Sequence, residues 1–188
     1  MAISYYDDIL IAKLKRWLPS NHKVRVLGPG EGKRLLETQA DDSKDKALKL
    51  PLIALSREPN ITLLHNTKQP NSFDGPRLIN DPKAPQQLLL NMIPIKVDYQ
   101  LDIYAKTQLE VEEYVRSFVF KLINNPTLMV EVPYNGTYYR HIANIRLNDT
   151  VSDTSDASER LFAGQFCRWT LQLELQDAFL FNIPYKDT

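Results

Sequence analysis

The sequence predicts an α+β fold: a mostly antiparallel sheet flanked by an N-terminal helix and a central helix, with long loops between them. Apolar and polar residues alternate from Ile93 to Tyr104 and again from Phe166 to Gln176, as they do in strands that bury one face. Apolar residues recur at helical spacing in residues 3–18 and in the segment after Thr107. The length of 188 residues suits a single domain, 1–188, with a sizeable core.

The N-terminal helix is amphipathic, and Pro19 ends it. Its apolar side is predicted to comprise Tyr6, Ile9, Leu10, Leu14, Trp17 and Leu18. The charged residues expected elsewhere on the helix are Asp7, Asp8, Lys15 and Arg16. Weak alternation predicts a strand at 21–27, and the glycines at 28–32 predict a turn after it.

The middle of the chain is irregular. Residues 37–49 are polar and charged, which favours a solvated loop or a marginal helix. The short apolar runs at 50–55 and 61–65 fit either buried strands or helix fragments, because runs of this length carry no decisive period. Four prolines exclude a regular element at 66–87 and predict a long loop or, as the favoured interpretation, an extended arm that contacts a partner.

The central helix follows the strand at 93–104 directly. Thr107 and Glu110 form a capping-box pattern at its start, and Pro126 forces the chain out of the helix near Asn125. After it, the sequence predicts strands at 127–132 and 141–147, a polar loop at 148–160 and a final strand at 166–176. The apolar residues at 179–185 are expected to pack on the same domain or on a neighbouring subunit.

Composition limits the classes of function. Lys+Arg and Asp+Glu both number 23, which argues against a protein that binds nucleic acid through a basic surface. With one cysteine, Cys167, the chain has no intrachain disulfide or cysteine-based zinc site, and a reducing compartment fits. Because no apolar run approaches the roughly 20 residues of a membrane helix and no secretory signal opens the chain, we expect a soluble protein made in the cytoplasm.

Motifs for phosphate binding and catalysis are incomplete. In GPGEGKR, three residues separate Gly28 from Gly32 and Arg34 follows Lys33, so the spacing of a Walker loop fails. No Gly-x-Ser-x-Gly nucleophile elbow occurs. We therefore expect a glycine turn, no cofactor and no enzymatic activity. A small-ligand or nucleotide enzyme that uses this turn as an anion loop is a less favoured alternative.

Metal binding is not favoured either. The histidines His22, His65 and His141 lack neighbouring ligands and are interpreted as surface or hydrogen-bonded strand residues. The polar loop lacks the alternating ligands and the glycine of a calcium-binding loop, although it carries Asp149, Asp153, Asp156 and Glu159. This loop is either solvated or an interface patch whose charges pair with cations of another subunit.

Two motifs stand out in the C-terminal half. One strand contains Pro-Ile-Lys-x-x-Tyr-x-Leu-x-Ile-Tyr and leads into an acidic helix, and the last strand contains Arg-Trp-x-Leu-x-Leu-Glu-Leu. With the order of elements, they resemble the tail terminator proteins of contractile-tailed bacteriophages, best over residues 91–185. The matching residues are Pro94, Ile95, Lys96, Tyr99, Leu101, Ile103, Tyr104, Glu112, Val115, Arg168, Trp169, Leu171, Phe181 and Pro184.

The resemblance implies a non-enzymatic virion protein that forms a hexameric ring at the head-proximal end of the tail. The ring caps the tail tube and the last sheath layer, contacts head-completion proteins of the neck, and meets DNA only as passing genome. Another head-tail connector or a baseplate component is an alternative within the virion.

A ring subunit presents two different surfaces to its neighbours, which suggests candidate interface residues. One candidate surface is the polar face of the first motif, Lys96, Asp98, Gln100 and Asp102. The other is the charged part of the polar loop, Asp153, Asp156, Glu159 and Arg160. The candidates to line a DNA channel are Lys33, Arg34 and Arg140.

Overall fold

The structure is a computed structural model, and it describes residues 3–18, 24–29, 50–64, 92–134, 137–155 and 166–181. Its elements follow in the order α1 (Ser4–Trp17), β1 (Arg25–Leu27), β2 (Leu52–Leu63), β3 (Met92–Ala105), α3 (Gln108–Asn124), β4 (Thr127–Tyr134), β5 (Thr137–Asp153) and β6 (Cys167–Phe181). The predicted arm at 66–87 and the polar stretch at 37–49 lie outside the described residues.

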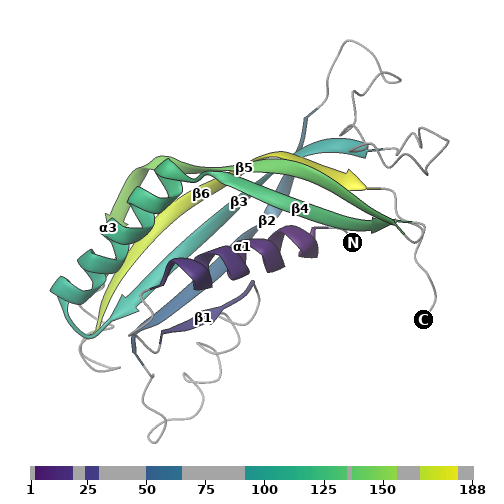
Figure 1. The fold of residues 1–188 in the computed structure, drawn as a ribbon. Helices are drawn as coiled ribbons and strands as arrows, with labels where there is room; N and C mark the ends of the chain where they lie inside the picture. The colour runs from purple at the N-terminus through teal and green to yellow at the C-terminus, as the bar shows by residue number, and fades with distance from the viewer. Residues whose placement is uncertain are drawn as a thin grey trace, which may run out of the picture.

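The strands form one six-stranded sheet in the order β1-β2-β3-β6-β5-β4 (Figure 1). β1 pairs with β2 in parallel, and every other neighbouring pair is antiparallel. The sheet is therefore mixed. The predicted α+β class is confirmed, and the parallel pair at one edge is the departure from a purely antiparallel arrangement.

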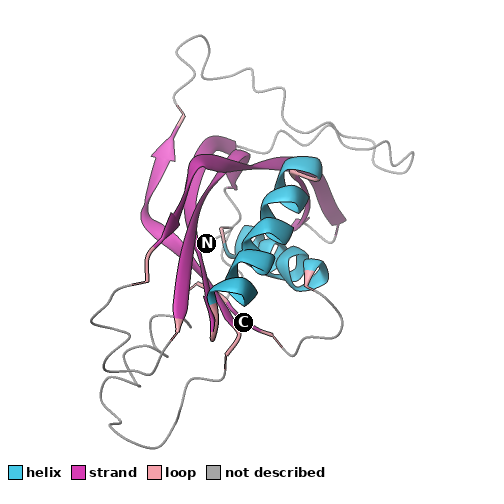
Figure 2. Ribbon diagram, turned by 90° about the vertical axis from the view of Figure 1, so that its left-hand side faces the viewer, coloured by secondary structure: helices cyan, strands magenta, loops and turns pink. Residues whose placement is uncertain are grey.

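The helices α1 and α3 lie on the same side of the sheet, which curves around them (Figure 2). α1 contacts the two edge strands, β4 and β1, whereas α3 lies across β3, β5 and β6. α1 therefore spans the open side of the curved sheet between its edges (Figure 1).

The core lies between the helices and the sheet. On β3, every second side chain faces it and is fully buried: Ile95, Val97, Tyr99, Leu101 and Ile103. This burial confirms the predicted alternation on β3. β3 pairs along its length with β6, whose Leu171, Leu173 and Leu175 are also buried. From the helices, the buried side chains are Ile3, Tyr6, Leu10, Leu14, Trp17, Val111, Tyr114, Val115, Phe118 and Leu122.

Bulges interrupt the strands and account for most differences from the predicted boundaries. In β2, the three residues between Arg57 and Ile61 oppose a single residue on β3, Asp98, so 52–55 and 61–63 of the two apolar runs belong to one strand. Pro59 lies within this bulge, where the lack of an N–H costs no ladder hydrogen bond. Extra residues at such points increase the local bend of a strand.

The predicted polar loop at 148–160 is wrong for residues 148–153. β5 continues to Asp153 because Val151 pairs with Leu171 after a bulge that begins at Leu147. The alternation is lost at the bulge, where the residues are polar, and this hid the strand in the sequence.

A third bulge lies in β6 and lets that strand continue to Phe181, beyond the predicted end at Gln176. Asp177 has φ of 57° there, a left-handed conformation that aspartate tolerates better than most residues. Asn144 Nδ2 donates to Asp177 Oδ2 at 2.7 Å and holds the bulge against β5. The first apolar residue of the predicted tail, Phe179, is therefore part of the sheet.

The start of α3 is capped as its sequence predicts. Thr107 has extended backbone angles, and its hydroxyl accepts a hydrogen bond from Glu110 N at 3.3 Å. The Glu110 carboxylate reaches back to Lys106 N, one residue before the cap, at 3.3 Å. The helix thus begins at a fixed point directly after β3.

The two faces of α3 give a matched test of the core. Replacing Phe118, which is 1% exposed, by alanine should lower the free energy of unfolding by about 3–5 kcal/mol through lost burial and a cavity. Phe120→Ala on the same helix removes a ring that is 63% exposed and should change it by less than about 0.5 kcal/mol. Urea denaturation at low protein concentration measures both, and equal losses would mean that the two faces are wrongly assigned.

Candidate functional site

Asp102 is the centre of a polar network on the sheet face opposite α1 and α3. The residue is 4% exposed. Its carboxylate accepts hydrogen bonds from Thr170 Oγ1 at 2.6 Å and from Gln100 Nε2 at 2.9 Å, and it pairs with Arg168 Nη2 at 3.2 Å. The Arg168 guanidinium also lies 5.5 Å from the centre of the Tyr104 ring. These contacts offset the cost of burying a carboxylate.

A second polar cluster on the same face of β3 surrounds Lys96. Lys96 Nζ lies 2.6 Å from Glu174 Oε2 and 3.6 Å from Asp98 Oδ1. The hydrogen bond with Glu174 raises the pKa of Lys96, and the same bond lowers the pKa of Glu174. The Lys96 and Asp98 side chains remain 33% and 38% exposed, so this cluster reaches solvent.

The four residues predicted to form a contact face on β3 therefore lie on one face, as their alternation predicts. They form two pairs, Lys96 with Asp98 and Gln100 with Asp102, and each pair also contacts β6: Lys96 pairs with Glu174, and Gln172 Nε2 donates to Gln100 Oε1 at 3.4 Å. A partner would meet two clusters of side chains here, with Asp102 buried in one of them. Contact between this face and another subunit stays a prediction.

The loop charges predicted as a second contact surface lie mostly outside the described residues, namely Asp156, Glu159 and Arg160. Asp153 is described and exposed at the end of β5. Its carboxylate accepts a hydrogen bond from Ser155 N at 2.9 Å, which shapes the turn after the strand.

Of the residues predicted to line a channel, Lys33 and Arg34 lie outside the described residues. Arg140 is exposed on β5, where its Nε lies 2.5 Å from Glu131 Oε1 of the neighbouring strand β4. The carboxylate of Glu131 in direct contact weakens the attraction of Arg140 for a polyanion such as DNA.

A buried ion pair that the sequence did not predict fixes α1 to the sheet. Asp7, expected on the polar side of α1, is only 8% exposed. Its carboxylate accepts a hydrogen bond from Tyr99 Oη at 2.7 Å and pairs with Arg57 Nη1 at 2.6 Å. Burial raises the pKa of Asp7, and the contacts with Tyr99 and Arg57 oppose that shift. Asp7 thereby ties α1 to β2 and β3.

The neighbouring Tyr6 ties α1 to β5 and β6. Its hydroxyl lies 2.8 Å from His141 Nε2 and accepts a hydrogen bond from Phe179 N at 2.8 Å. The His141 ring makes edge contacts with the rings of Tyr6 and Phe179, each at 5.6 Å between centres. His141 is thus a buried, hydrogen-bonded strand histidine, and its burial lowers its pKa to about 4.

The sequence did contain a signal for the burial of Asp7. Position 7 is four residues after Ile3 and three before Leu10, and both of these are buried. Asp7 therefore lies within the apolar stripe by helical spacing, where a charge needs a buried partner. Its partners Tyr99 and Arg57 are far away in the sequence, so their identity could not be predicted.

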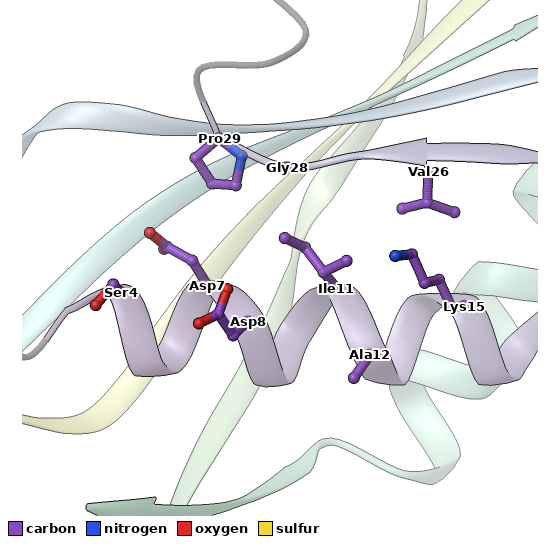
Figure 3. Close-up of a pocket in the computed structure, with 9 residues that line it drawn as sticks. All are labelled: Ser4, Asp7, Asp8, Ile11, Ala12, Lys15, Val26, Gly28 and Pro29. Atoms are coloured by element: carbon purple, nitrogen blue, oxygen red, sulfur yellow. The ribbon is translucent and has the colours of Figure 1, made fainter.

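A groove of about 530 Å³ lies between α1 and β1 (Figure 3). The described residues that line it are Ser4, Asp7, Asp8, Ile11, Ala12, Lys15, Val26, Gly28 and Pro29. Ile11 and Lys15 point from α1 toward β1, where Val26 faces them (Figure 3). Two aspartates lie close to Gly28, and carboxylates there are unfavourable neighbours for a phosphate anion.

Several large apolar side chains are exposed outside this groove. On α3 they are Leu109, Phe120 and Ile123, with exposed fractions of 80%, 63% and 65%. Met129 on β4 and Ile142 on β5 are paired across the strands on the face opposite α1 and α3 and are 62% and 59% exposed. Side chains of this kind in contiguous groups are typical of protein contact surfaces.

The described residues contain no group of three or more histidine, cysteine, aspartate or glutamate side chains arranged to hold a metal ion. No helix within the described ranges is both long enough and apolar enough to cross a membrane. A scan against models of protein families found no match, and a search of curated protein sequences also found none.

The buried histidine predicts a pH-dependent stability. Because His141 has a pKa of about 4 when folded and an ordinary value of 6.5, the unfolded chain takes up this proton first as the pH falls. The contribution of neutral His141 is therefore complete above about pH 6.5 and is lost toward pH 4, on the order of 2–3 kcal/mol in total.

His141→Gln keeps a hydrogen-bonding side chain without titrating in this range. Urea denaturation at about pH 7 and about pH 4.5 should show a smaller acid-induced loss for this variant than for the wild-type protein. Equal losses in the two proteins would show that His141 does not titrate with a lowered pKa.

Proposed function

We propose that this chain is a structural virion protein without enzymatic activity, a tail terminator of a contractile-tailed bacteriophage. In this proposal, six copies form a ring in the neck at the head-proximal end of the tail. The ring caps the tail tube and the tail sheath, stops their growth and joins them to head-completion proteins. DNA meets the ring only when the genome passes through it.

The observation that carries the proposal is the pairing of the two stretches that bear the resemblance. The strand that contains Pro94 and the strand that contains Arg168 are neighbours, β3 and β6, and they pair antiparallel from Met92 to Ala105. α3, which contains the matching residues Glu112 and Val115, lies across both strands. The resemblance therefore covers one packed unit of the fold rather than scattered segments.

The exposed apolar residues support a role in assembly. Leu109, Phe120 and Ile123 on α3 expose most of their side chains, as do Met129 and Ile142. Leaving such groups in water is unfavourable by about 25 cal/mol per Å² of apolar surface, so their burial against partners would stabilise a complex.

Growth of tail tubes in the presence of the purified chain tests this proposal. Tubes polymerised from the tube protein encoded with this chain should stay short and carry a ring at one end in electron micrographs. The mass of the ring gives its number of subunits. A control with the tube protein alone establishes unlimited growth.

Two outcomes would overturn the proposal. A chain that stays monomeric and leaves tube and sheath growth unchanged is not a tail terminator. A ring found only at the baseplate end of the tail would instead assign the chain to the baseplate.

A further inference from the structure

We draw no further inference here: the strongest candidate, the outward face of α3 with its exposed apolar side chains Leu109, Phe120 and Ile123, carries none, because nothing in the described residues shows what covers it.

Discussion

The contacts of Tyr6 and Asp7 with four strands are the constraint on which the arrangement of α1 depends. Asp7 reaches β2 and β3 through Arg57 and Tyr99, and Tyr6 reaches β5 and β6 through His141 and Phe179. A buried carboxylate without these partners would cost several kcal/mol, so α1 has one favourable position and orientation on the sheet. The polar contacts therefore fix the helix, and the apolar stripe around them supplies most of the stabilisation.

This position of α1 determines which surfaces of the molecule are left for partners. α1 lies between the two edges of the curved sheet, where Lys13 donates to Thr127 O of β4 and the opposite side of the helix forms the groove with β1. At the C-terminal end of α1, Trp17 O accepts a hydrogen bond from Lys121 of α3, which links the two helices. On the opposite face of the sheet, Lys96 pairs with Glu174 and Arg168 pairs with Asp102, whereas the exposed charges Lys15 and Arg16 of α1 and Glu113 and Arg116 of α3 make no ion pair within the described residues.

The local parts of the fold could be predicted from the sequence, and the non-local parts could not. The strand β3 and the helix α3 have clear periods of two and 3.6, and the Thr107 cap marks the boundary between them. β5 was predicted too short because its bulge interrupts the alternation, and only the pairing of Val151 with Leu171 shows that the strand continues.

The candidate site shows the same division. Alternation placed Lys96, Asp98, Gln100 and Asp102 on one face, but their contacts depend on the register between β3 and β6, which the sequence does not specify. The groove also depends on a non-local contact, between α1 and a three-residue strand. Exposed apolar residues on α3 could be found by placing Phe120 and Ile123 on a helical wheel, since they lie off the stripe that contains Phe118.

The most direct test of the proposed tail terminator is an electron cryomicroscopy map of tails assembled in the presence of this chain. The map should show a ring of copies of the chain at the head-proximal end of the tail tube, with exposed apolar side chains such as Phe120 buried against a neighbouring protein chain. Tails that carry no ring of this chain at that end would contradict the account.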